Sequence, residues 1–261
     1  RPSGGVRLRR SFCLVPSPAF RRLPCGDRSL AGQVRGVCGE DRLMAAPPDI
    51  GRGCPEILRP EEIEARSMEI IASLLPPDCC RPEEMPVVMR LVHASGDPLL
   101  VEAIRFHPEA IEAGVEALLR GAGVVTDAQM VMLGINRGRL GQRGGKAYCS
   151  IAEETVVEES AKTGRTRAAI AIRSLAEHID GGVVAIGNAP TALREVLALA
   201  REGTARPALV IGMPVGFVDA AESKSALMAS DLIWISIEGT RGGSPLAAAA
   251  VNALLRMVEK K

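Results

Sequence analysis

GGVVAIGNAPTALREVLALAREGTARPALVIGMPV, residues 181–215, contains two short apolar runs, each followed by a segment with helical character. The runs are Val183–Ile186 and Ala208–Ile211, and the predicted helices are Thr191–Glu202 and Ala220–Ala229. Apolar runs of this length are typical of strands that are buried on both faces of a parallel sheet. Because strand, helix and strand in this order form a crossover unit, the segment predicts a parallel α/β core.

The alternation of strands and helices continues outward in both directions. The predicted elements are a helix from Pro60 to Leu75, a helix from Pro86 that Gly96 ends, a strand Val101–Phe106, a helix Pro108–Arg120, a strand Gly123–Thr126, a short helix from Asp127, a Gly/Arg loop Gly138–Gly145, a strand Lys146–Ile151, helical stretches on both sides of residues 164–167, a strand Leu232–Ile237 and a helix Pro245–Lys260. This order predicts a doubly wound three-layer α/β/α fold with a mostly parallel sheet, of the flavodoxin-like or Rossmann-like kind.

Ligands of doubly wound folds lie beyond the carboxyl ends of the strands. In this chain those ends carry small and polar residues, namely Thr126-Asp127, Gly187-Asn188-Ala189, Gly212-Met213-Pro214 and Glu238-Gly239. We therefore expect the functional site at this edge of the sheet.

Composition and charge narrow the function classes. Hydrophobic residues make up 47% of the chain and aromatic residues only 2%, so the predicted core consists of Ala, Val, Ile, Leu and Met. The net charge of +1 conceals an asymmetry, because residues 1–43 contain nine Arg, no Lys and three acidic residues. Residues 44–261 then have 23 basic and 28 acidic side chains, a net charge of −5, which argues against general nucleic-acid binding.

Residues 1–43 differ from the rest of the chain. They hold three of the seven Cys and show no sustained helical or strand period, and the first Met is Met44. An Arg-rich, acid-poor leader could be an organelle transit peptide. The composition shift at Met44 favours translated upstream sequence or an expression artefact, and we expect this segment to be disordered. Residues 44–261 are expected to form a single domain without a membrane span.

The Cys and Gly patterns predict neither a metal site nor a nucleotide site. Cys79 and Cys80 are adjacent, Cys149 is remote, and there is no CxxC pair, so we expect no metal and a reduced, cytoplasmic protein. The loops Gly138–Gly141 and Gly239–Gly243 lack the GxGxxG order, and no phosphate-binding P-loop motif is present. Their glycines are expected to let the backbone approach a bulky ligand or a partner subunit.

The segment PVVMRLVHASGD, residues 86–97, places Arg90 and His93 three residues apart. On a helix such residues share one face. Arg suits a two-pronged grip on a carboxylate, and His suits proton transfer near neutral pH. From spacing alone, a solvated Arg and a His at a helix end are the favoured interpretation.

Five ordered segments add a resemblance to this pattern: RLVHASGD, TDAQMVMLGIN, VVAIGNAPTAL, PALVIGMPVGFVDAAESK and GTRGGSPLAAAAVNALL. Together they resemble the precorrin-8X methylmutase family, also called cobalt-precorrin-8 methylmutase, of cobalamin biosynthesis, from about Ile57 to Met257. The resemblance implies an isomerase that moves a methyl group from C-11 to C-12 of the corrinoid macrocycle and needs no S-adenosylmethionine, metal or nicotinamide. It also implies a homodimer with sites near the subunit interface, where the Ala-rich helix Leu246–Leu255 would suit close packing.

The resemblance implies a set of site residues. His93 would be the general acid, and Ser67, Arg90 and Arg167 would bind the substrate, whose acetate and propionate side chains are carboxylates. His107 and His178 are expected to be structural. Lys224 could pair with Glu222, contact a neighbouring subunit or hold a substrate carboxylate. A corrinoid carrier without catalytic activity is the alternative function.

We expect residues 1–43 to be dispensable, because their composition and lack of periodicity set them apart from the predicted domain. A protein that starts at Met44 should unfold at the same temperature as the full chain and bind the corrinoid product equally well. Thermal melting and a spectroscopic titration measure the two properties. An insoluble shortened protein, or one that no longer binds corrinoid, would contradict this expectation.

Overall fold

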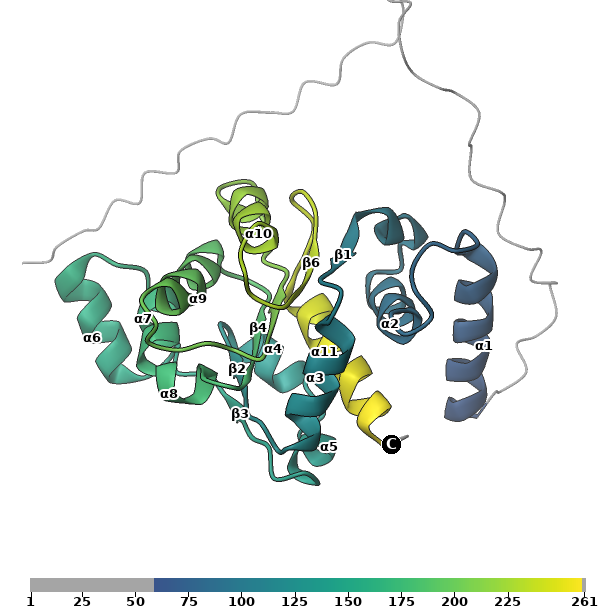
Figure 1. Cartoon of the computed structure of the whole chain (residues 1–261), viewed down its shortest axis with the longest axis horizontal. Helices are drawn as coiled ribbons and strands as arrows, with labels where there is room; N and C mark the ends of the chain where they lie inside the picture. Colours follow the sequence, from purple (N-terminus) through teal and green to yellow (C-terminus); the bar gives the residue numbers. More distant parts are fainter. Residues whose placement is uncertain (1–58, 260–261) are drawn as a thin grey trace, which may run out of the picture. The chain divides into compact units, whose positions relative to one another are not determined.

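The computed structural model describes residues 59–259, in which six strands form one sheet (Figure 1). The strand order is β1-β6-β5-β4-β2-β3. Strands β2 to β6 are parallel, and β1 pairs with β6 in the antiparallel direction. The bounds are β1 Ile104–Phe106, β2 Val124–Thr126, β3 Ala147–Tyr148, β4 Val183–Ile186, β5 Leu209–Gly212 and β6 Trp234–Ile237. The predicted mostly parallel sheet is confirmed, whereas the interpretation of residues 1–43 falls outside the described residues.

Helices cover both faces of the sheet, which confirms the three-layer prediction. One face packs against α1 Pro60–Leu74, α2 Met85–Ser95, α3 Ala110–Leu119, α4 Gln129–Gly134, α5 Arg137–Gly141 and α11 Ser244–Val258. The other packs against α7 Arg167–Ser174, α8 Ala176–Ile179, α9 Pro190–Arg201 and α10 Ala220–Met228, with α6 Glu154–Thr163 beside α7. No helix within residues 59–259 has the length and apolar character that crossing a membrane requires.

Alternation along β4 shows how the sequence produces two faces. Val183 and Ala185 belong to the core cluster with α2, α3 and α11, and Val184 and Ile186 belong to the cluster with α7 and α9. All four side chains are fully buried. A strand with both faces covered needs apolar residues at every position, which is why the run has no polar alternation.

Three predicted elements were wrong in part. Of the predicted strand Lys146–Ile151, only Ala147–Tyr148 forms a strand, β3. The segment predicted as strand Val101–Phe106 begins as a 3-10 helix, Pro98–Ala103, because the Asp97 carboxylate accepts the Leu99 N–H at 3.0 Å and Pro98 favours a first helical turn. The predicted loop Gly138–Gly145 contains the short helix α5. There Asn136 caps the start by accepting the Arg139 N–H at 3.0 Å, and the buried Leu140 anchors the turn.

Helix α11 packs inside the subunit, and its predicted place at a subunit interface stays a prediction. Ten of its residues are buried, five of them Ala or Ser. They pack against the sheet, α2, α3 and α4. The small side chains allow these neighbours to approach closely: a Cβ on Gly187, at the end of β4, would lie 2.6 Å from the Ser244 Cα.

A buried carboxylate joins the ends of β2 and β4. Asp127 is almost fully buried, and its two oxygens accept the backbone N–H groups of Gly187, Asn188 and Ala189 at 3.0, 2.8 and 2.6 Å. Burial raises the pKa of the Asp127 carboxyl, against the opposing effect of these donors. Its position at the sheet end is therefore structural as well as close to the expected site.

A buried amine lies in the helical layer that contains α7, α9 and α10. Lys224 of α10 is completely buried, and its Nζ donates a hydrogen bond to the Arg241 carbonyl oxygen. No ion pair within residues 59–259 includes Lys224, so the pairing with Glu222 that the sequence allowed is not formed. Burial lowers the pKa of the Lys224 amine to about 8.

Replacing Asp127 with Ala should lower the free energy of unfolding by about 2–4 kcal/mol, because three buried N–H groups lose their acceptor. Urea unfolding monitored by circular dichroism measures the change. The matched control is Asp231→Ala, which removes an exposed carboxylate and should cost less than about 1 kcal/mol. Equal losses for the two variants would show that Asp127 does not hold the strand ends together.

The free energy of unfolding of Lys224→Met minus that of the parent should decrease as pH rises from 7 to 10. The buried amine has a lowered pKa, so the unfolded parent binds more protons than the folded parent above about pH 8. The parent therefore gains stability with rising pH, on the order of 2 kcal/mol, and the variant lacks this gain. Urea unfolding of both proteins at each pH measures it. If the free energies of unfolding of the two proteins change with pH in parallel, the pKa of Lys224 is not lowered.

Candidate active site

Helix α2 presents His93 from a firmly packed support. Pro86 lies in its first turn, and Gly96, with φ +66°, ends it in the left-handed conformation. Val87, Val88, Leu91 and Val92 are buried in the core cluster that includes α11. His93 lies in the last turn and is exposed. The predicted helix is confirmed, and its histidine is open to a ligand.

Arg90 already holds a carboxylate that belongs to the protein. This half-buried side chain forms an ion pair with Glu64 of α1, and Arg256 of α11 contacts the same Glu64 oxygen at 2.8 Å. The hydrogen bonds from Arg90 and Arg256 hold the pKa of the Glu64 carboxyl below its ordinary value. Arg90 thus pairs with Glu64 of the protein, whereas its predicted contact with a substrate carboxylate stays a prediction.

Ser67 lies on the face of α1 that also carries Glu64 and Ile71. The side chain is half-buried, and its Oγ donates to the Ile63 carbonyl oxygen at 2.8 Å within the same helix. Ile71 is the buried residue of α1. Ser67 and Arg90 thus belong to two helices that pack against each other, with Glu64 between the helices.

The cavity beside Arg90 lies away from His93. It has a volume of about 1040 Å³ and is lined by residues of α1, α2, α3 and α11, among them Met68, Met85, Met89 and Arg90. His93 is not one of the residues that line it. Because the first turn of α2 and the last turn of α11 contribute to it, the cavity lies toward the opposite end of α2.

Arg167 comes from the opposite layer. It is exposed at the first position of α7, where the preceding Thr166 caps the helix by accepting the Ala169 N–H at 3.3 Å. Thr166 also donates to the Thr191 hydroxyl at 2.8 Å. This contact puts the start of α7 beside the start of α9, at the carboxyl end of β4. Arg167 therefore shares the sheet edge with the end of α2 but not its helical layer.

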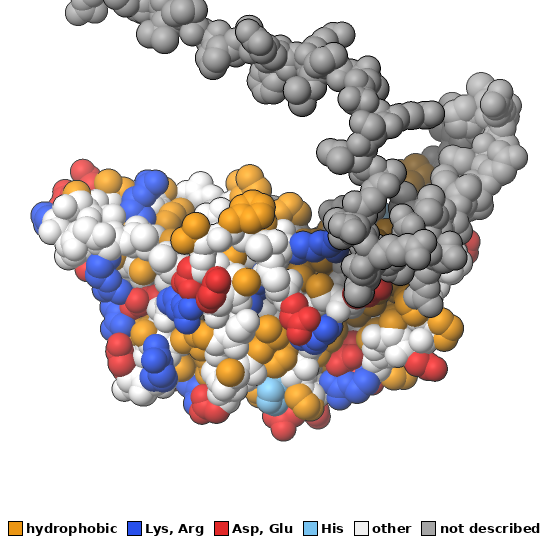
Figure 2. All heavy atoms as spheres, turned by 90° about the horizontal axis from the view of Figure 1, so that it is seen from above, with side chains coloured by type: hydrophobic (Ala, Val, Ile, Leu, Met, Phe, Trp, Pro, Cys, Tyr) orange, Lys and Arg blue, Asp and Glu red, His pale blue; other side chains and the backbone are white. Residues whose placement is uncertain are grey.

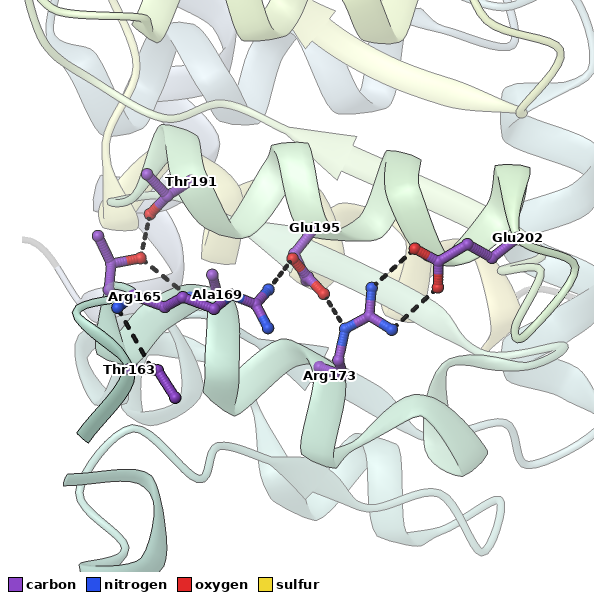
Figure 3. Close-up of polar contacts among 8 residues, drawn as sticks. Thr163, Arg165, Ala169, Arg173, Thr191, Glu195 and Glu202 are labelled. Carbon is purple, nitrogen blue, oxygen red and sulfur yellow. Dashed lines mark hydrogen bonds and ion pairs between the residues drawn. The ribbon is translucent and has the colours of Figure 1, made fainter. Parts of the chain in front are cut away.

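Ion pairs with α9 account for two further cations, Arg165 before α7 and Arg173 within it (Figure 3). The buried Glu195 accepts hydrogen bonds from Arg165, at 2.6 Å, and from Arg173. Arg173 also makes two parallel hydrogen bonds to Glu202, at 2.9 and 3.0 Å. Contacts with Glu202 and Glu195 raise the pKa of Arg173, so its charge is fixed. Arg165, near the candidate Arg167 in sequence, thus has a structural partner.

The other two histidines take structural roles, as predicted. His107 Nδ1 accepts the Glu109 N–H at 3.2 Å, in the turn before α3. The His178 ring stacks on Tyr148 with ring centres 4.0 Å apart. Within residues 59–259, no group of three or more His, Cys, Asp or Glu side chains could hold a metal ion.

The loop after β6 reaches the end of the His93 helix, a contact that the sequence did not predict. Arg241 forms an ion pair with Asp97 at 3.0 Å. Asp97 follows the helix-ending Gly96 and lies four residues after His93. The signal was present, because Asp97 ends the RLVHASGD segment and Arg241 lies in GTRGG, but nothing in the spacing linked the two.

Apolar side chains are exposed after β5. Phe217 is 93% exposed and Val218 is 85% exposed. The loop that carries them is tied to α9 by Arg194, whose Nε donates to Asp219 at 3.1 Å. Figure 2, which views the molecule from above, shows hydrophobic side chains reaching the surface between Lys or Arg and Asp or Glu side chains. Such exposure of a Phe is typical of a surface that contacts a ligand or a partner.

Comparisons with known proteins agree with the architecture. A family model described as precorrin-8X methylmutase matches residues 62–257. Cobalt-precorrin-8 methylmutase of Priestia megaterium is 44% identical over 200 residues, which cover 77% of this chain and 89% of the relative. Precorrin-8X methylmutase of Pseudomonas aeruginosa is 44% identical over 170 residues, covering 64% and 81%.

A solved structure matches the fold as a whole. The crystal structure of precorrin-8x methyl mutase from Thermus thermophilus is 40% identical and has a TM-score of 0.72, covering 77% of this chain and 97% of that one. The residues that the family model matches, 62–257, include the sheet, both helical layers and the His93 helix. The chain therefore belongs to the precorrin-8X methylmutase family.

Proposed function

We propose that this chain catalyses the migration of a methyl group from C-11 to C-12 of precorrin-8X or cobalt-precorrin-8. The family consists of isomerases that act within one substrate molecule, and the relatives named above are called methylmutases. The observation that carries the proposal for this chain is His93, an exposed imidazole on the last turn of a helix with a buried opposite side. None of those relatives is named as a carrier protein.

His93 would act as the general acid. A proton placed on the conjugated ring makes its carbon framework poorer in electrons, which favours the shift of the methyl group. The bond from the methyl carbon to C-11 breaks as the bond to C-12 forms. Because the product is an isomer, the proton from His93 is balanced by a proton that leaves the rearranged ring. A positioned general acid of this kind contributes a rate factor of about 10²–10⁴.

Positively charged side chains would hold the substrate carboxylates. Arg167 is exposed and lies at the sheet edge where ligands of this fold bind. Arg90 can take a substrate carboxylate if it releases Glu64, because Arg256 still contacts that oxygen. Ser67, on the α1 face with Glu64, would add a hydroxyl. Holding a flexible macrocycle in the reactive geometry supplies much of the remaining acceleration.

The active form would be a homodimer in the cytoplasm. The exposed Phe217 and Val218 supply apolar surface for a second subunit, since exposed apolar patches mark interaction sites. The free thiols of Cys79, Cys80 and Cys149 fit a reducing compartment. Light scattering coupled to size-exclusion chromatography gives the mass in solution, and a mass of one chain would reject the dimer.

His93→Ala should separate chemistry from binding. Turnover of the unrearranged substrate, followed by its visible spectrum, should fall by about 10²–10⁴ because the proton donor is lost. Product affinity should change little, since the carboxylate contacts belong to other residues. The matched control is His178→Ala, on the other layer, which should turn over at nearly the parent rate. Parent-like turnover by His93→Ala would exclude His93 as the general acid.

Arg90→Ala should weaken product binding about ten- to a hundredfold, because a charge-assisted contact is worth roughly 1.5–3 kcal/mol. Glu64→Gln serves as its counterpart: it removes the competing charge but keeps Arg90, so affinity should stay the same or increase. Spectroscopic titration measures both variants. A folded Arg90→Ala protein with unchanged affinity would place Arg90 outside the site and leave it a structural partner of Glu64.

A further inference from the structure

The buried amine of Lys224 is costly and must be explained. The residue is completely buried on α10, and within residues 59–259 no carboxylate forms an ion pair with it. Its ammonium group donates a hydrogen bond to one backbone oxygen, that of Arg241. A buried charge without a counter-charge destabilises the folded state, and an apolar side chain of similar length would avoid that cost. Retention of such a group at a costly position is typical of functional sites.

The loop that Lys224 holds has little freedom. In residues 239–243, Thr240 accepts the Gly216 N–H at 3.2 Å, and Gly243 donates its N–H to Met213 at 2.8 Å. Gly242 has φ +159°, and a Cβ there would lie 2.3 Å from the Met213 oxygen. The backbone of the loop is thus fixed against the segment after β5. Lys224 adds a third contact, to the carbonyl oxygen of Arg241, which lies between Thr240 and Gly243.

The side chain of Arg241 contacts the helical layer that contains α2. Arg241 contacts Asp97 at 3.0 Å, and Asp97 also accepts the Leu99 N–H at 3.0 Å. Asp97 directly follows Gly96, where the His93 helix ends. An unbroken series of contacts therefore runs from Lys224, through the backbone and side chain of Arg241, to the end of α2.

We infer that Lys224 is a positioning residue for the methyl migration: it fixes the Arg241 loop, and through the Arg241–Asp97 ion pair it fixes the end of the helix that carries His93. The inference rests on the proposed function, because it concerns the placement of the proposed general acid. Lys224 itself does not reach the substrate, since it is fully buried. Small displacements of a catalytic group are costly, and a shift of about 1 Å can lower a rate a hundredfold.

The test compares Lys224→Met, Arg241→Ala and the double variant, with the purified full chain and the unrearranged substrate. Lys224→Met should lower kcat about ten- to a hundredfold, while product affinity stays within about threefold of the parent. Arg241→Ala should lower kcat by a similar factor. Because both changes break the same series of contacts, the double variant should lose no more than the more severe single variant. The control is Lys162→Met, which removes an exposed lysine of α6 and should leave kcat unchanged.

Two outcomes would overturn the inference: a Lys224→Met protein with parent kcat, or losses that multiply in the double variant. If Lys224→Met does not fold, Arg241→Ala decides, because parent kcat in that variant would also break the series. If the parent itself does not rearrange the substrate, the proposed function fails and amide hydrogen exchange tests the positioning. Faster exchange in residues 239–243 and 93–97 of Lys224→Met would support the structural relay, and unchanged exchange would reject it.

Discussion

The acceptance of three backbone N–H groups by Asp127 is the contact on which the arrangement of this sheet edge depends. After β2, the chain adds β3 on one side of it and β4, β5 and β6 on the other. The strand order therefore reverses between β2 and β4. In doubly wound folds the reversal opens a crevice where the N–H groups at the start of the next helix bind an anionic ligand. Here the carboxylate of Asp127 takes those N–H groups itself. The protein thus supplies its own anion where a nucleotide-binding relative of this fold would bind phosphate.

The proposed general acid lies elsewhere, beside the edge of the sheet that β1 and β6 form. His93 is offered by a helix whose Val88, Leu91 and Val92 are buried, so its backbone is firmly held while its imidazole remains open. The antiparallel strand β1 brings the chain after α2 beside β6. The Arg241 loop, which follows β6, can therefore contact Asp97. The direction of one short strand determines which loop meets the end of the helix that carries the proposed general acid.

The sequence predicts most of this architecture because the information is local. Val183–Ile186 is apolar at every position, and Gly96 marks the end of α2, so short-range patterns are sufficient for both. The failures arise where a side chain overrides the pattern. Asp97 caps a 3-10 turn inside a predicted strand, and Asn136 caps a helix inside a predicted loop. The Ala residues of α11 fit an interior and an interface equally well, and the structure shows their contacts in the interior.

The site was harder to predict than the fold because its contacts span long distances along the chain. Arg90 was identified from its spacing to His93, yet its partner Glu64 lies 26 residues earlier. Arg241 and Asp97 are separated by more than half of the chain, and Lys224 meets Arg241 through a backbone oxygen, which no sequence pattern encodes. Arg167 was selected from the family resemblance, and its position at the sheet edge follows only from the contact between Thr166 and Thr191.

Helix α1 is held to the domain by a few apolar contacts and by charge. Ile71 is its buried anchor, whereas Ile63, Ile70 and Leu74 stay exposed, and Glu64 joins it to Arg90 and Arg256. Attraction between partly exposed charges weakens as ionic strength rises, with a screening length near 10 Å at 0.1 M salt. Raising the salt content of the buffer therefore weakens the charged contacts that help to dock this helix, while the sheet and α11, held by apolar burial, are much less sensitive to it.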